Sequence, residues 1–154
     1  KDEPERTNFE LGVSYCYPRK ISKELLSIPK KGFVNYHPGP LPKYKGPREL
    51  MDAIKNKEIN WGVTVHQMNE EYDSGKIIKI KQIKLHEPPI ATEELGAVSH
   101  YFLFNLFKET ILDIFLLLTL PFRPLHGILG LNIHDDEPVA NKSPPIIYYI
   151  IYFS

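Results

Sequence analysis

Hydrophobic and polar positions follow two different periods along the first 120 residues. Short apolar or alternating runs predict four strands, at residues 11–16, 32–36, 61–68 and 76–85. Spacings of three and four residues predict three helices, at residues 23–27, 47–56 and from Thr92 onward. The alternation in the fourth strand slips near Lys81 and Gln82, which predicts a β-bulge there. This order of elements predicts an α/β domain with a mostly parallel sheet.

Proline divides the chain into regions. It makes up 14 of the 154 residues, about 9% where ~5% is usual. Five prolines follow residue 120, so we expect a polar segment over 1–10, a folded domain over 11–120 and an irregular Pro-rich tail over 121–154. The sequence assigns the tail no role. Its last apolar run, IIYYIIYF, is compatible with either an added strand or aggregation.

The charge balance and apolar runs exclude several partners. Nineteen Lys and Arg residues match nineteen Asp and Glu residues, so no net charge favours DNA or an anionic membrane. The charge-free run at 114–122 is far shorter than the ~20 residues of a membrane-spanning helix. The polar first ten residues carry no secretion signal, and Cys16 has no internal disulfide partner. We therefore expect a cytoplasmic protein that binds neither DNA nor membrane.

Candidate chemistry begins where the second predicted strand ends. Asn35 and His37 are two residues apart, so both side chains lie on one side of the strand. Ligands bind at the carboxyl ends of strands in open α/β sheets, and Pro38 stiffens the loop that follows. The simpler alternative is a capped strand end with a hydrogen-bonded histidine.

A second loop carries Asp73 in an Asp-Ser-Gly turn, where aspartate is common for structural reasons alone. If the two loops are neighbours, Asp73 orients His37 and the two form an acid–base pair. His66 is interpreted as packed on its strand, close enough in sequence to line the same cleft. The histidines lack metal-ligand spacing, so no metal is expected.

Three segments together resemble a known family. They are Asn35-Tyr-His37-Pro-Gly-Pro-Leu41-Pro42-Lys-Tyr-Lys-Gly46, Gly62-Val-Thr-Val-His66 and Asp73-Ser-Gly75. Their order and spacing resemble the folate-dependent formyltransferases, whose loop signature is Asn-x-His-Pro/Gly-x-x-Leu-Pro-x-x-x-Gly. The resemblance runs over about residues 11–112 and implies a Rossmann-like formyltransferase fold. It departs at Gly39, where the family commonly has a serine hydroxyl.

The resemblance implies an enzyme that transfers a formyl group from 10-formyltetrahydrofolate to an amine acceptor. Asn35, His37 and Asp73 match the family's catalytic trio. In that role, Asn35 and His37 stabilise a tetrahedral intermediate and Asp73 assists proton transfer. The family's folate-binding positions fall on two segments here: Arg19, Lys20 and Ile21, and Asn69, Glu70, Glu71 and Tyr72.

The resemblance leaves alternatives for acceptor and activity. The chain matches the folate side of the family, and the family's amino-terminal half is expected to be missing before Leu11. A small nucleotide or sugar amine is favoured over aminoacyl-tRNA because the chain leaves no room for an appended β-barrel. The alternatives are an inactive remnant that binds folate or a partner, and a formyltetrahydrofolate hydrolase. The sequence does not indicate the oligomeric state.

Overall fold

The structure, a computed structural model, describes residues 10–119 and 149–153. Its elements are five strands, β1 (Leu11–Tyr15), β2 (Phe33–His37), β3 (Asn60–Gln67), β4 (Ile77–Lys84) and β5 (Tyr149–Phe153), and three helices, α1 (Lys23–Leu26), α2 (Glu49–Lys55) and α3 (Thr92–Thr119). The predicted strands and helices therefore all form. Most of the expected Pro-rich tail, residues 121–148, lies outside the described residues. The run after it forms β5, the strand alternative.

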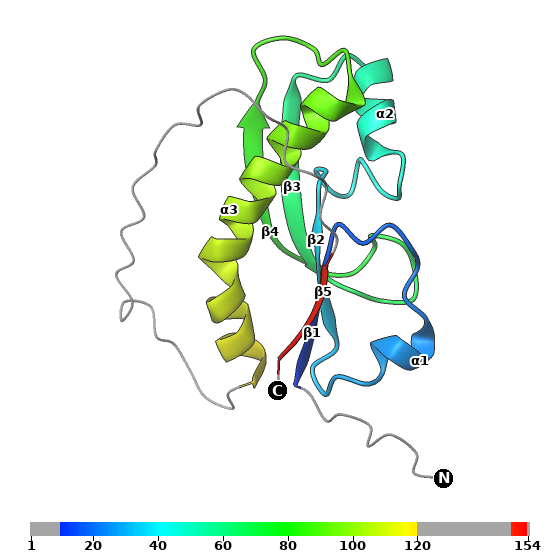
Figure 1. Cartoon of the computed structure of the whole chain (residues 1–154), viewed down its shortest axis with the longest axis vertical. Coiled ribbons are helices and arrows are strands. Elements are labelled where there is room, and N and C mark those ends of the chain that lie inside the picture. The colour runs from blue at the N-terminus through cyan, green and yellow to red at the C-terminus, as the bar shows by residue number, and fades with distance from the viewer. Residues whose placement is uncertain (1–9, 120–148, 154) are drawn as a thin grey trace.

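The sheet is mixed, with the order β4-β3-β2-β1-β5 (Figure 1). Only β1 and β2 run parallel, and the other three neighbouring pairs are antiparallel. The expected α/β class is confirmed, but the expectation of a mostly parallel sheet is wrong for the described strands. The chain leaves β2 at His37, passes through α2 and returns as β3, which runs antiparallel along β2.

The expected β-bulge is also misplaced. Gln82 and Lys81 pair regularly with Gly62 and Val63. The register shifts instead between Val65 and His66, nearer the start of β4. The irregularity thus lies beside the loop that joins β3 to β4.

One face of the sheet packs against α3, which crosses the strands in Figure 1. Val13, Val34, Tyr36 and Val63 face this helix and are fully buried with its Leu103 and Leu106. Two buried hydrogen bonds link the layers, from Trp61 Nε1 to Ser99 Oγ at 2.8 Å and between the Tyr36 and Thr110 hydroxyls at 2.9 Å. Because strand side chains alternate, the residues between these core positions point to the opposite face.

On that opposite face, β1 and β2 make a close contact. Gly12 pairs with Phe33, and a Cβ atom on Gly12 would lie 2.4 Å from the Phe33 ring. Phe33 is 2% exposed, so its ring has little room to move aside. Glycine is required here by packing.

We expect Gly12→Ala to lower the free energy of unfolding by about 1–3 kcal/mol, the usual cost of overpacking a core. Gly96→Ala, on helix α3, is the control, because a Cβ atom there would meet only Leu50 Cδ1 of α2, at 3.5 Å. That change should be neutral or stabilising by up to ~1 kcal/mol. Urea unfolding of the two variants measures the difference, and equal stabilities would contradict the packing argument.

Candidate active site

The site starts from a row of polar side chains across three strands. Ser14 pairs with Asn35, and Asn35 pairs with His66. All three are buried on the face away from α3. His37 lies two residues beyond Asn35, on the same side of β2, and is 4% exposed. The expectation that Asn35 and His37 share one side of the strand is confirmed.

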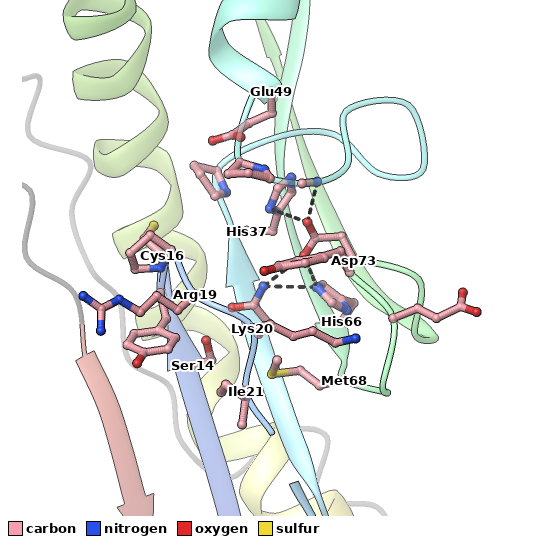
Figure 2. A pocket seen from close by; sticks show the side chains of 18 of the residues that line it. Ser14, Cys16, Arg19, Lys20, Ile21, His37, Glu49, His66, Met68 and Asp73 are labelled. Atoms are coloured by element: carbon pink, nitrogen blue, oxygen red, sulfur yellow. Dashed lines mark hydrogen bonds and ion pairs between the residues drawn. The ribbon is translucent and has the colours of Figure 1, made fainter. Parts of the chain in front are cut away.

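Asp73 joins this row from the loop between β3 and β4. Its Oδ1 accepts a hydrogen bond from Asn35 Nδ2 at 3.3 Å and lies 3.3 Å from His66 Nε2. Its Oδ2 accepts from the Gly46 backbone N–H at 2.8 Å and lies 3.5 Å from His37 Nδ1. One carboxylate therefore contacts β2, β3 and the loop before α2, so the two loops are neighbours, the condition on which the pairing of Asp73 with His37 depends (Figure 2).

The Asp-Ser-Gly turn has a steric reason. Asp73 has a positive φ of 46°, which Asp tolerates better than most residues. Gly75 passes so close to β3 that a Cβ atom would lie 1.8 Å from the Gln67 carbonyl oxygen. Only glycine allows the loop to fold back so tightly and bring Asp73 over the row.

The loop after β2 fixes the orientation of His37. The ring's Nε2 donates to the Tyr44 carbonyl at 2.6 Å, which leaves Nδ1 facing Asp73. Thr64 holds the same loop, since its hydroxyl donates to the Gly39 carbonyl and accepts from the Leu41 N–H. At Gly39 a Cβ atom would lie 3.0 Å from His37 Nε2, so a serine there would crowd the ring.

Burial and charge set the protonation states. Burial lowers the pKa of His37, although the nearby Asp73 carboxylate works in the opposite direction. Burial tends to raise the pKa of Asp73, but the hydrogen bond to His66, the charge of His37 and the Gly46 N–H outweigh it and lower that pKa to about 2. The free site thus holds an ionised Asp73 beside a neutral His37 near neutral pH.

These groups line a cavity of about 250 Å³. All ten residues singled out from the sequence line this cavity: Arg19, Lys20, Ile21, Asn35, His37, Asn69, Glu70, Glu71, Tyr72 and Asp73. Ile21 is buried, whereas the other residues of the two outer segments are exposed at the rim. Across the rim, Lys23 and Glu70 form an exposed ion pair of 2.8 Å that links α1 to the 69–72 loop.

Sequence reasoning missed several lining residues. Ser14, Cys16, Glu49 and His100 also face the cavity. His66, which the sequence placed on its strand and close enough to line the same cleft, lines the cavity and contacts Asp73 directly. No sequence signal pointed to Glu49, since a glutamate in the first turn of a helix is common at the surface.

Two kinds of feature are missing from the described part of the chain. No group of His, Cys, Asp and Glu side chains there is arranged to hold a metal ion. Among those same residues, no helix is long and apolar enough to cross a membrane.

Comparison with known proteins identifies the fold family. Residues 1–99 match the family model described as formyl transferase. The chain belongs to this family. Solved formyltransferases share the fold. The N-formyltransferase from Helicobacter canadensis, solved with folinic acid and dTDP-3-aminofucose, superposes with a TM-score of 0.59 at 27% identity, covering 73% of this chain and 42% of that one.

Other formyltransferases match smaller parts of the chain. Glycinamide ribonucleotide transformylase 1 from Geobacillus kaustophilus gives a TM-score of 0.57 at 30% identity, over 69% of this chain and 54% of that one. The methionyl-tRNA formyltransferase of Ehrlichia ruminantium (strain Gardel) is 38% identical over 87 residues, 56% of this chain and 29% of the relative. The chain thus spans less than a third of the length of this curated relative.

The low pKa of Asp73 predicts an acid-sensitive contribution to stability. The folded-state pKa of about 2 lies below the ordinary 3.8, so the ionised carboxylate stabilises the fold above about pH 4 and this stabilisation is lost as the pH falls toward 2. We expect Asp73→Asn to be less stable than the unaltered protein by about 2 kcal/mol above pH ~4, with the difference shrinking in acid. Urea unfolding as a function of pH measures it.

The control is Asp113→Asn, which removes an exposed carboxylate from α3 outside the cavity. Its effect on stability should be small, because an exposed charge on a helix surface contributes little. A stability difference for Asp73→Asn that stayed constant down to pH ~2.5 would contradict the assigned ionisation.

Proposed function

We propose that this chain carries the folate-binding and catalytic face of a formyl transferase, which moves a formyl group from 10-formyltetrahydrofolate to a primary amine. The observation that carries the proposal is the Asp73 carboxylate, which lies within 3.5 Å of Asn35 Nδ2 and His37 Nδ1 at the wall of one cavity. The family match and the folinic acid named for the Helicobacter canadensis relative support the choice of donor.

The donor's ring system would enter between the two outer segments. Ile21 and Met68 give that part of the cavity apolar walls, and the rim residues Asn69 to Tyr72 close its other side. The Lys23–Glu70 ion pair links the two segments at the exposed rim of the cavity. A flat heterocycle with polar edges suits such a slot, because apolar surfaces stack on its faces and backbone groups meet its edges.

Asn35 and His37 are the proposed donors to the formyl oxygen. As the amine attacks the formyl carbon, that oxygen gains negative charge, and fixed N–H donors stabilise it. In the free site Asn35 Nδ2 donates to Asp73 Oδ1 and lies 3.2 Å from His66 Nε2. His37 has its Nε2 engaged by Tyr44, so the nitrogen left for substrate is Nδ1, which becomes an N–H donor only when the ring takes up a proton during the reaction.

Asp73 would then favour the protonated form of His37. Burial disfavours the imidazolium, and the adjacent carboxylate favours it. A proton taken up at Nδ1 during the reaction therefore lies between Asp73 and the developing oxyanion, both negative. From there it is available to the folate nitrogen that leaves.

The acceptor is proposed only by its chemistry. Named relatives include methionyl-tRNA, phosphoribosylglycinamide and sugar N-formyltransferases. Their acceptors all present an amine. The choice of a small nucleotide or sugar amine over aminoacyl-tRNA stays a prediction. A water molecule in place of the amine would make the same trio a hydrolase.

The test combines donor binding with turnover. Calorimetry should detect saturable binding of 5-formyltetrahydrofolate (folinic acid), weakened about 10-fold or more in Asp73→Ala. The reason is that Asp73 holds the loop after β3 against Asn35 and Gly46 by charge-assisted hydrogen bonds, each contributing ~1.5–3 kcal/mol. Transfer from 10-formyltetrahydrofolate to a panel of amines should fall roughly 10²–10³-fold in His37→Ala. The matched controls are Asp113→Ala and His86→Ala, both exposed and outside the cavity.

Two results would overturn the proposal. One is a folded chain that binds no folate at millimolar concentration. The other is a His37→Ala protein that transfers formyl at an undiminished rate. Folate binding without transfer to amine or water would instead support the binding-remnant alternative.

A further inference from the structure

A second carboxylate lines the cavity without a role in the scheme above. Glu49, the first residue of α2, is 8% exposed. Its Oε2 is buried and has no hydrogen-bond partner. A buried carboxylate oxygen without a donor costs free energy, so its retention in a cavity indicates a ligand that supplies the donor.

The surroundings of Glu49 are anionic or neutral. Asp73 and Asp52 raise its pKa by charge repulsion, and Cys16 lies close enough for its own pKa to be raised by Glu49. The histidines nearest this end of the cavity, His37 and His100, both have pKa values lowered by burial. Within the described residues that line the cavity, no permanently cationic side chain comes from α2, α3 or the ends of β2 and β3.

The cavity's basic side chains belong to a different wall. Arg19 and Lys20 follow β1, and Figure 2 shows Arg19 directed away from His37 and Asp73. The same view places Glu49 above His37, at the opposite end from Ile21 and Met68. The proposed folate slot and the Glu49 carboxylate thus occupy different ends of one cavity, with the trio between them.

We propose that Glu49 is the acceptor-binding carboxylate, whose Oε2 takes a hydrogen bond from the acceptor's primary ammonium and removes one of its protons. The removal of a proton by Glu49 rests on the proposed formyl transfer. The recognition of a primary ammonium by Glu49 requires only the cavity. A cation at this position reduces the charge repulsion between Glu49 and Asp73, and its N–H donates a hydrogen bond to the unpaired Oε2.

The proton balance of the step is simple. The ammonium, R–NH₃⁺, gives one proton to Glu49 and becomes a nucleophile. Its nitrogen then forms a bond to the formyl carbon, and the bond from that carbon to folate N10 breaks. A second ammonium proton ends on N10, so the products are R–NH–CHO and tetrahydrofolate, and the proton held by Glu49 returns to water.

The pKa values support this division of labour. Burial is the main cause of the raised pKa of Glu49, whereas the pKa of Asp73 is lowered to about 2. Of the two carboxylates, Glu49 is therefore the stronger base. A general base works best when its pKa lies near the working pH, so Glu49 suits proton removal and Asp73 suits a fixed charge.

The experiment measures recognition of the amine separately from turnover. Glycinamide, a small primary amine, and glycolamide, its hydroxyl analogue, are titrated near neutral pH into the full chain, followed by protein NMR. The titrations are run with and without saturating 5-formyltetrahydrofolate, which is not a formyl donor here. We expect glycinamide to bind at least 10-fold more tightly than glycolamide. Glu49→Gln should reduce this preference to within twofold and leave the Kd for 5-formyltetrahydrofolate unchanged within twofold.

Two further variants make the result interpretable. Glu94→Gln makes the same chemical change at an exposed position of α3 and should keep the full preference. Glu49→Asp retains the charge but withdraws it by one methylene, and should weaken glycinamide at least threefold. If Glu49→Gln does not fold, the aspartate variant decides: an unchanged glycinamide affinity overturns the inference.

The outcomes separate this inference from the proposed function. No amine preference in the unaltered chain, or a preference that survives in Glu49→Gln, overturns the role of Glu49 even where folate binds. A preference that depends on Glu49 in a chain that binds no folate supports the amine site and overturns the formyl transfer.

Discussion

The arrangement of the site depends on one buried carboxylate. Asp73 accepts from the Asn35 amide and the Gly46 N–H and lies beside His37 and His66. These contacts outweigh the cost of burial, because they lower the pKa of Asp73 to about 2. An ionised group with that many partners fixes the positions of two loops and the end of β2 relative to one another.

The rest of the fold meets this constraint through backbone geometry. The row of Ser14, Asn35 and His66 follows from strand register alone. Glycine at position 75 lets the β3–β4 loop close onto β3, and the positive φ of Gly46 turns its N–H toward Asp73. The opposite face of the sheet buries its core under α3, whose Gly96 and His100 also line part of the cavity.

Local patterns in the sequence predicted the elements and much of the site, and tertiary effects account for the errors. Alternation placed Asn35 and His37 on one side of β2, because that signal depends on residues close in the chain. Asp73 lies 38 positions from Asn35 and was added only by the family motif. The predicted parallel direction was wrong for β3, because the direction of a strand is decided by where its connection re-enters the sheet, which local patterns do not specify. Glu49 was missed because its burial depends on the cavity that α2 closes, which no local pattern encodes.

The most direct test of the central role of Asp73 is an NMR pH titration of the His37 ring in the unaltered protein and in Asp73→Asn. With Asp73 present, the neutral ring should carry its proton on Nε2, bound to Tyr44, and its pKa should lie below the ordinary 6.5. Removing the carboxylate's charge should lower the pKa of His37 further, since Asp73 favours the imidazolium. A pKa of His37 that is unchanged or raised in Asp73→Asn would contradict the account.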